Sequence, residues 1–226
     1  NFNTGSFGNL ALDLGGSVYF APQTNSGGNT YPIGALSGSS STATLGGGSA
    51  GRATYSIGAS NASTTFAGAI ATNAALTKVG TGTLTLTGNL AYTGATTISA
   101  GALQIGNGGA ASALAGLVVN NGALSFNSSS DLVQTTDISG TGALTKAGTG
   151  KLTLGGSNSY AGATSVNAGT LQLAKVASLY NGVTSNWTAA NLSVASGATL
   201  ALNVGGIGEF TSNQVATLLA NVDGAV

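Results

Sequence analysis

The amino-acid sequence predicts an all-β fold in which short strands stack into a parallel β-helix (β-solenoid), with a short helical segment near the C-terminal end. Three observations predict it: a long internal repeat, alternation of apolar and polar residues within that repeat, and glycine-rich turns between the alternating segments. A sandwich or barrel of antiparallel hairpins also accommodates many short strands. The internal repeat favours the solenoid, because stacked coils reuse one structural unit.

The repeat is thirty residues long and occurs twice. The segment from Leu76 reads LTKVGTGTLTLTGNLAYTGATTISAGALQI, and the segment from Leu144 reads LTKAGTGKLTLGGSNSYAGATSVNAGTLQL. The copies are identical at 18 of 30 positions without a gap. The offset from Leu76 to Leu144 divides into three coils of about 22 to 23 residues, each long enough for three short strands and three turns. We therefore expect the second copy to occupy equivalent places three coils further along.

Within each copy the residues alternate in the manner of a half-buried strand. Thr83, Thr85 and Thr87 alternate with Leu84 and Leu86, so the leucines are expected to point inward and the threonines outward. The same alternation predicts the remaining interior residues of the two copies, which are Ile98, Leu103, Ile105, Leu152, Leu154, Val166, Leu171 and Leu173. Glycine is expected at tight corners, where positive φ or close backbone approach is needed.

Composition restricts the classes of function. The 226 residues include only five Lys or Arg and five Asp or Glu, with a formal net charge of zero, so nucleic acid is not expected as a partner. Histidine and cysteine are absent, which leaves no Ser-His-Asp triad, no imidazole or thiolate metal site and no disulfide. No apolar run is long enough for a membrane span in this segment. We therefore expect no cofactor and no metal.

The two copies resemble the passenger-associated transport repeat of bacterial autotransporter proteins. They match a pattern close to L-T-K-x-G-x-G-x-L-x-L-x-G followed by Y-x-G-x-T-x-[IV]-x-A-G-x-L-x-[IVL] over residues 76–105 and 144–173, and the resemblance extends loosely into 55–70 and 191–204. It implies a right-handed parallel β-helix that is exported and displayed outside the cell. It also implies that the repeat supports export and folding of the passenger domain.

The expected organisation has three parts. Residues 1–50 are expected to form irregular N-terminal coils or a cap, with a strand at 17–20 and a Gly/Ser-rich loop or linker at 38–48. Residues 51–205 are expected to form the β-helix core. Residues 206–226 are expected to form a short helix or cap, and the parent chain is expected to continue. The helix would begin at Thr211 or Ser212, and its apolar face would consist of Val215, Leu218, Leu219 and Val222. We interpret it as a cover for the end of the core, with docking of a partner as the alternative.

No set of catalytic residues is recognisable. The carboxylates are Asp13, Asp131, Asp137, Glu209 and Asp223, and the only arginine is Arg52. Asp131 and Asp137 are the only two carboxylates close enough in the sequence to be considered for paired-carboxylate glycoside hydrolysis. We expect both to be solvent-exposed surface residues instead. We expect the protein not to be an enzyme.

A lysine and a tyrosine recur at equivalent positions of the two copies, and each allows two interpretations. Lys78 and Lys146 are expected to be solvated turn residues, with a charged ladder that blocks edge pairing or binds an anionic glycan as the alternative. Tyr92 and Tyr160 are expected to pack in the core or in turns, with stacked exposed rings for sugar binding as the alternative. Trp187 is expected to anchor the loop around it.

These observations predict an extracellular structural or adhesive surface protein displayed on a bacterial cell. A filament subunit that stacks end to end is the second hypothesis, since low charge weakens repulsion between molecules. A polysaccharide-active β-helix enzyme is the third. The partners that fit the first two hypotheses are further copies of the chain, a host surface or a glycan.

Overall fold

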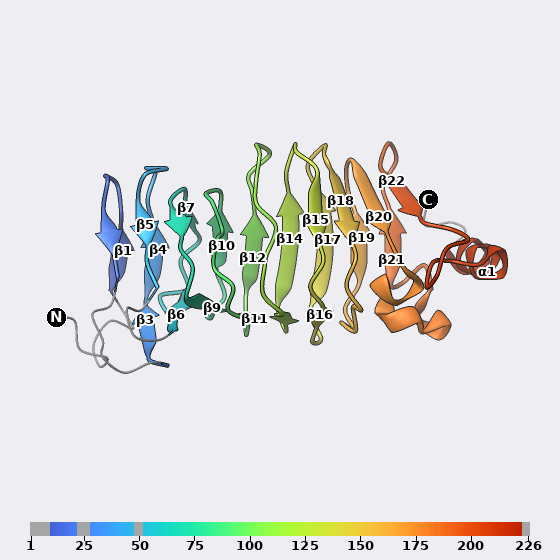
Figure 1. Ribbon diagram of the computed structural model, residues 1–226, viewed down its shortest axis with the longest axis horizontal. Coiled ribbons are helices and arrows are strands. Elements are labelled where there is room, and N and C mark those ends of the chain that lie inside the picture. The colour runs from blue at the N-terminus through green and yellow to red at the C-terminus, as the bar shows by residue number, and fades with distance from the viewer. Residues whose placement is uncertain (1–9, 22–27, 48–51, 223–226) are drawn as a thin grey trace.

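The computed structural model describes residues 10–21, 28–47 and 52–222. Throughout these residues every strand pair is parallel, and the strands stack into an elongated rod along which the chain advances from one end to the other (Figure 1). A single hydrophobic core runs along the inside of the coils. The predicted parallel β-solenoid is therefore confirmed, while its right-handed winding stays a prediction.

The coils present three faces. The first face is a seven-stranded sheet of β7 (Thr64–Phe66), β10 (Thr83–Leu86), β12 (Ala102–Ile105), β14 (Ala123–Asn127), β17 (Ala143–Ala147), β19 (Thr164–Val166) and β21 (Leu192–Val194). The second face is a six-stranded sheet of β3 (Thr30–Ile33), β6 (Ala53–Ile57), β9 (Ala74–Lys78), β11 (Thr96–Ile98), β13 (Val118–Asn120) and β16 (Ile138–Ser139). Near the N-terminal end, β1 (Ala11–Asp13) pairs with β4 (Ala35–Ser37), which is joined to β7 by a bridge between Gly38 and Phe66.

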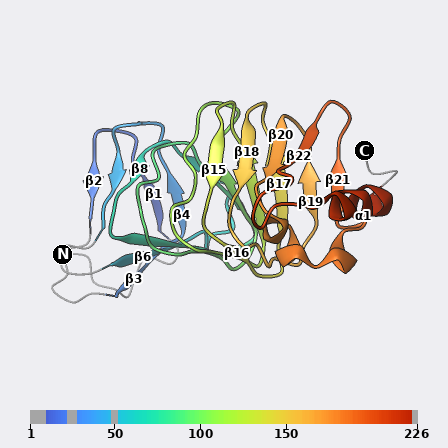
Figure 2. The same cartoon turned by 45° about the vertical axis from the view of Figure 1, so that its right-hand side comes forward.

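The third face consists of two shorter sheets. The sheet near the N-terminus contains β2 (Tyr19–Phe20), β5 (Thr44–Leu45) and β8 (Ala69–Ile70). The sheet further along contains β15 (Leu132–Gln134), β18 (Lys151–Leu154), β20 (Thr170–Leu173) and β22 (Thr199–Leu202), which succeed one another toward the C-terminal end (Figure 2).

The coils in the repeat region are shorter than expected. Several hydrogen bonds that join one coil to the next connect residues only 20 apart in the sequence. The chain passes from Leu76 on the second face to Leu84 on the first face, and three coils then lead from Leu84 through Leu103 and Leu124 to Leu144. The two copies are thus separated by three coils and one additional face. The expected coil length was therefore wrong, because it assumed that the copies are separated by a whole number of coils.

The two copies consequently lie on different faces. The first copy begins with β9 on the second face and continues with β10 on the first face, whereas the second copy begins with β17 on the first face and continues with β18 on the third. The expectation that the second copy fills equivalent places three coils later is corrected. The prediction of which side chains point inward is nevertheless confirmed. All ten predicted interior residues of the two copies are buried, with exposed fractions of 0–1%.

The strands β1 to β5 belong to the stacked parallel sheets of the rod. The segment expected as a loop or linker contains β5, and its Ala43 and Leu45 are completely buried. Glycine and serine are compatible with this packing because small side chains fit at corners where coils lie close together. The linker alternative is therefore wrong as far as Gly47, whereas residues 39–43 and 46–47 form the turns and loops around β5 that the other alternative expected. Residue 48 lies outside the described residues.

The C-terminal end of the rod is covered by α1 (Ser212–Val222) (Figure 1). Its N-terminus is a capping box, in which the Gln214 amide donates to Thr211 Oγ1 at 3.3 Å and the Thr211 amide donates to Gln214 Oε1 at 2.9 Å. Leu218 and Val222 are buried, as expected for a helix that covers the core. Leu219 is 58% exposed and does not belong to the buried face.

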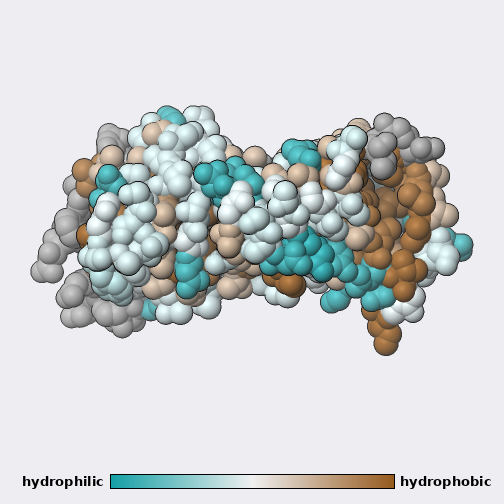
Figure 3. Space-filling model, turned by 90° about the horizontal axis from the view of Figure 1, so that it is seen from above, coloured by the Kyte–Doolittle hydropathy of each residue, from teal (hydrophilic) through white to brown (hydrophobic). Residues whose placement is uncertain are grey.

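The surface of the rod differs between its middle and its C-terminal end. Seen from above, the middle presents mainly polar or weakly apolar side chains, whereas strongly apolar ones gather toward the C-terminal end (Figure 3). Val204 and Ile207, which precede α1, and Leu219 within it are the exposed large apolar residues of this part of the chain. The end that α1 covers therefore still carries apolar surface. In the middle of the rod, Leu117 and Val133 are the exposed large apolar residues.

Three short 3-10 helices precede the last coil. They are η1 (Val176–Ser178), η2 (Tyr180–Gly182) and η3 (Thr184–Asn186). Trp187 follows them and is fully buried, with its ring centroid 5.7 Å from that of Phe210. Trp187 therefore anchors this segment, as predicted.

Candidate functional site

The two lysines of the repeat are buried at coil corners. The Lys78 ammonium donates three hydrogen bonds, to the carbonyl oxygens of Val79 at 2.7 Å, Gly80 at 2.9 Å and Ala100 at 3.3 Å. Val79 and Gly80 form the corner after β9, and Ala100 belongs to the corner one coil later. The ammonium thus ties two successive corners together, and each of its three N–H groups has a carbonyl partner.

Lys146 repeats this arrangement on another face. Its ammonium donates to the carbonyls of Ala147 at 2.9 Å, Gly148 at 2.8 Å and Ala168 at 2.9 Å. Burial lowers the pKa of both lysines below the usual range, and at Lys146 the charge of Asp131 acts in the opposite direction. Lys78 is 1% exposed and Lys146 is 2% exposed, so the expected solvated turn position and the alternative charged surface ladder were both wrong.

The tyrosines of the repeat point into the core. Tyr92 is buried, and its hydroxyl is 2.8 Å from Thr96 Oγ1; Tyr160 is buried, and its hydroxyl is 2.7 Å from Thr164 Oγ1. The threonines are also fully buried, so each hydroxyl pair satisfies two groups that water cannot reach. The core-packing interpretation is confirmed, and these rings are not available for stacking on a sugar.

The Tyr92–Thr96 pair leads to a testable prediction. Tyr92→Phe should lower the free energy of unfolding by about 1–2 kcal/mol, because it leaves the buried Thr96 hydroxyl without its partner. Thr96→Val should cost a similar amount, whereas the double variant should be closer to the wild type than the sum of the two. Urea denaturation of the four proteins measures this coupling, and strictly additive losses would contradict it.

The buried tyrosines also predict a response to alkaline pH. Burial raises the pKa of Tyr55, Tyr92, Tyr160 and Tyr180 above the usual value. Above about pH 10 the unfolded chain releases phenol protons that the folded chain keeps, so the free energy of unfolding should fall as the pH rises further. The buried lysines act in the opposite direction at somewhat lower pH. Urea midpoints measured between pH 8 and 12 should fall above pH 10, and Tyr160→Phe should flatten the decline.

The acidic residues that were candidates for catalysis support coil corners. Asp131 Oδ1 accepts a hydrogen bond from the Lys151 amide at 2.9 Å, and Asp137 Oδ1 accepts one from the Ser157 amide at 2.7 Å. Each carboxylate therefore caps the equivalent turn of the next coil, at an exposed position. Arg52 is exposed, and Asp223 lies outside the described residues.

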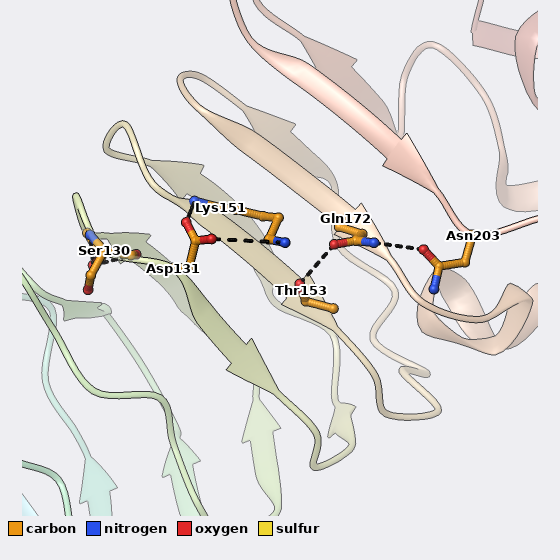
Figure 4. A network of polar contacts seen from close by, with 7 residues as sticks. Ser130, Asp131, Lys151, Thr153, Gln172 and Asn203 are labelled. Atoms are coloured by element: carbon orange, nitrogen blue, oxygen red, sulfur yellow. Dashed lines mark hydrogen bonds and ion pairs between the residues drawn. The ribbon is translucent and has the colours of Figure 1, made fainter.

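A strip of polar side chains lies on the third face (Figure 4). The Asp131 carboxylate and the Lys151 ammonium are 3.9 Å apart, which is the one ion pair found among the described residues. Further along, Thr153 Oγ1 donates to Gln172 Oε1 at 3.2 Å, and Gln172 Nε2 donates to Asn203 Oδ1 at 2.7 Å. We call these five residues the third-face polar strip. An exposed pair at 3.9 Å contributes at most about 1 kcal/mol to stability, so the strip is a candidate surface for contact and not a source of rigidity.

Several buried amide side chains were not singled out from the sequence. Asn120, Gln134 and Asn158 are completely buried, and each donates to a backbone carbonyl in a neighbouring coil, those of Ala143, Leu114 and Ser178 respectively. Like the repeat lysines, they tie neighbouring coils together from within. Asn120 and Gln134 do so outside the two copies, whereas Asn158 lies within the second copy, where the first copy has Leu90. Only their place at the inward positions of the alternation could have indicated it.

No group of three or more acidic, histidine or cysteine side chains that could hold a metal ion occurs in the part of the chain that the structure describes. Among the same residues, no helix has the length and apolar character needed to cross a bilayer.

A rod of stacked parallel coils, tied at its corners from within, defines this chain as a β-solenoid. The family model for the passenger-associated-transport-repeat matches it at residues 76–105 and 144–173, the two segments that contain Lys78 with Tyr92 and Lys146 with Tyr160. The chain thus carries two copies of this repeat, consistent with an autotransporter passenger domain. Comparison with curated proteins found no match, and comparison with solved structures found none either.

Proposed function

We propose that this chain is a section of an exported rod, displayed at a bacterial surface, that has a structural or adhesive role and performs no catalysis. The observation that carries the proposal is the occurrence of two passenger-associated transport repeats within one continuous solenoid. The family implies display outside the cell, and the fold supplies a long, uniform body.

The geometry of the repeats supports an architectural role for them. Their most distinctive polar side chains, Lys78, Lys146, Tyr92 and Tyr160, are all buried. Moreover, the copies lie on different faces, so they do not present a row of identical sites along one side of the rod. An adhesive contact would therefore involve a surface that only one copy builds. We propose the third-face polar strip, in which the second copy's Thr153 and Gln172 are joined by Lys151, which replaces a threonine of the first copy, and by Asp131 and Asn203 from outside the repeat.

Surface display can be tested with an epitope inserted between Gly108 and Gly109. An added Cβ at either glycine would meet no atom within 4 Å, so an insertion there should leave the coils intact. In cells that make the protein, an antibody should bind the epitope on intact cells. Binding only after the cells are permeabilised would overturn the proposal.

The adhesive role can be separated from a purely structural one. Replacing Thr153, Gln172 and Asn203 together by alanine should weaken attachment of the cells if the strip makes the contact. A matched control replaces Ser125, Thr145 and Ser165, which are in register on the first face, by alanine. Equal attachment by both variants would assign the protein a spacer role instead.

The two other hypotheses have their own tests. End-to-end stacking at the C-terminal end would have to displace α1, whose Leu218 and Val222 are buried there. Electron microscopy of concentrated protein should accordingly show single rods, and filaments would favour the filament hypothesis. The enzyme hypothesis assigns catalysis to the carboxylates of Asp131 and Asp137. If it holds, the wild type should cleave a polysaccharide and an Asp131→Asn, Asp137→Asn double variant should not.

A further inference from the structure

The two copies of the repeat keep the same internal register although they lie on different faces. In the first copy, Leu76–Lys78 pair with Thr96–Ile98, and in the second copy Leu144–Lys146 pair with Thr164–Val166. The other half of each copy behaves in the same way, since β10 pairs with β12 and β18 with β20 over four residues each. Each copy therefore contains both members of two adjacent strand pairs.

The hydrogen bonds that join the corner after the first strand of a copy to the corner one coil later also lie within that copy. The Ser99 amide donates to the Lys78 carbonyl at 2.8 Å, and the Asn167 amide donates to the Lys146 carbonyl at the same distance. The lysine ammonium of each copy thus finds all three of its hydrogen-bond partners inside that copy.

The strands that precede each copy in its sheets are different. In the first copy β9 stacks on β6, which reads ATYSI, whereas in the second copy β17 stacks on β14, which reads ALSFN. Likewise β10 stacks on β7 (TTF) and β18 stacks on β15 (LVQ). The two copies therefore adopt the same internal strand pairing although the strands beneath them differ in sequence and the copies lie on different faces of the rod.

We propose that each thirty-residue repeat is a self-contained stacking unit, which supplies both strands of two pairs and the lysine that ties their corners. Such a unit fixes the advance of the chain from one coil to the next wherever it falls around the rod. The adjoining coils take their register from it. This inference concerns how the solenoid is built and does not depend on the proposed display at a cell surface.

Hydrogen exchange of the full chain tests the proposal. In Lys78→Met, amides of 76–105 should exchange at least tenfold faster than in the wild type, while amides of 144–173 should be unchanged. Lys146→Met should give the mirror result. β6 and β13 flank the first copy's strands β9 and β11 on the second face. If exchange in Lys78→Met accelerates as much in β6 and β13 as in β12, the unit is the sheet and not the repeat, and the proposal is overturned.

Two deletions test independence from the face. Removing residues 76–143 joins Ala75 to Leu144 and turns every later strand by one face, while the second copy stays whole. Removing residues 84–143 is the matched control, because Leu84 and Leu144 lie in one register column of the first face, so later strands keep their faces. Both variants should fold with similar urea midpoints. Folding of the control alone would overturn the proposal, and if neither folds, hydrogen exchange of the full-length proteins decides.

Discussion

Lys78→Met is expected to lower the free energy of unfolding by about 3 kcal/mol or more. The substitution keeps most of the side-chain volume but removes the ammonium, so three carbonyl oxygens at two successive corners lose a charge-assisted hydrogen bond. Lys146→Met should have an effect of similar size, because its three carbonyl partners are equivalent. Urea denaturation followed by circular dichroism measures both.

Lys151→Met is the matched control for these variants. Its ammonium is exposed and lies 3.9 Å from Asp131, so its loss should change the free energy of unfolding by less than about 1 kcal/mol. If Lys78→Met and Lys151→Met lower the free energy of unfolding equally, the buried Lys78 ammonium does not tie the two corners together.

Gly101→Ala should be comparably damaging. Gly101 has a φ of +65°, and an added Cβ would lie 2.4 Å from the Gly80 carbonyl oxygen and 2.5 Å from that of Gly82. The left-handed conformation costs about 1–2 kcal/mol for a residue with a Cβ, and the close contact with backbone adds a packing penalty of about 1–3 kcal/mol. We expect a total loss of about 3 kcal/mol, measured as a lower urea midpoint.

The control for this glycine is Gly109→Ala. Gly109 has no atom within 4 Å of the added Cβ, and its φ is not positive. Alanine there should leave stability within about 0.5 kcal/mol of the wild type, or raise it slightly by restricting the unfolded chain. Equal losses at the two glycines would show that the close corner contacts do not limit the fold.

Much of the fold could be predicted from the sequence, because alternation of side chains along a strand is a local property. The inward leucines at 84, 86, 152 and 154 follow directly from a period of two, and the helix at 212–222 follows from its cap and apolar spacing. The repeat itself also predicted stacking of parallel coils, since hairpins do not require such internal identity.

The arrangement of the copies could not be predicted, because a sequence offset does not reveal how much of the chain one coil takes. The offset between the copies is compatible with three longer coils, or with three shorter coils and one additional face. The strand pairing on the first face distinguishes the two arrangements. There Leu84 pairs with Leu103, Leu103 with Leu124 and Leu124 with Leu144, so three coils already lead from Leu84 to Leu144.

The role of the lysines was missed for another reason. A charged residue beside glycines is typical of a solvated turn. Burial of Lys78 is possible only because carbonyl groups from two successive corners, those of Gly80 and Ala100, converge on its ammonium. Its position among the inward residues of β9, two places after Leu76, was the available signal.

The most direct test of the rotated arrangement is a pair of distances between spin labels, for which a chain without cysteine is well suited. One pair is placed at Gln104 and Ser165, which are three strand steps apart in one column of the first face, a Cα separation of about 14 Å. The other pair is placed at Gln104 and Gln172, which are equivalent in the repeat but lie on different faces. We predict the shorter distance for Gln104 and Ser165; a shorter distance for Gln104 and Gln172 would place both copies on the same face and contradict the account.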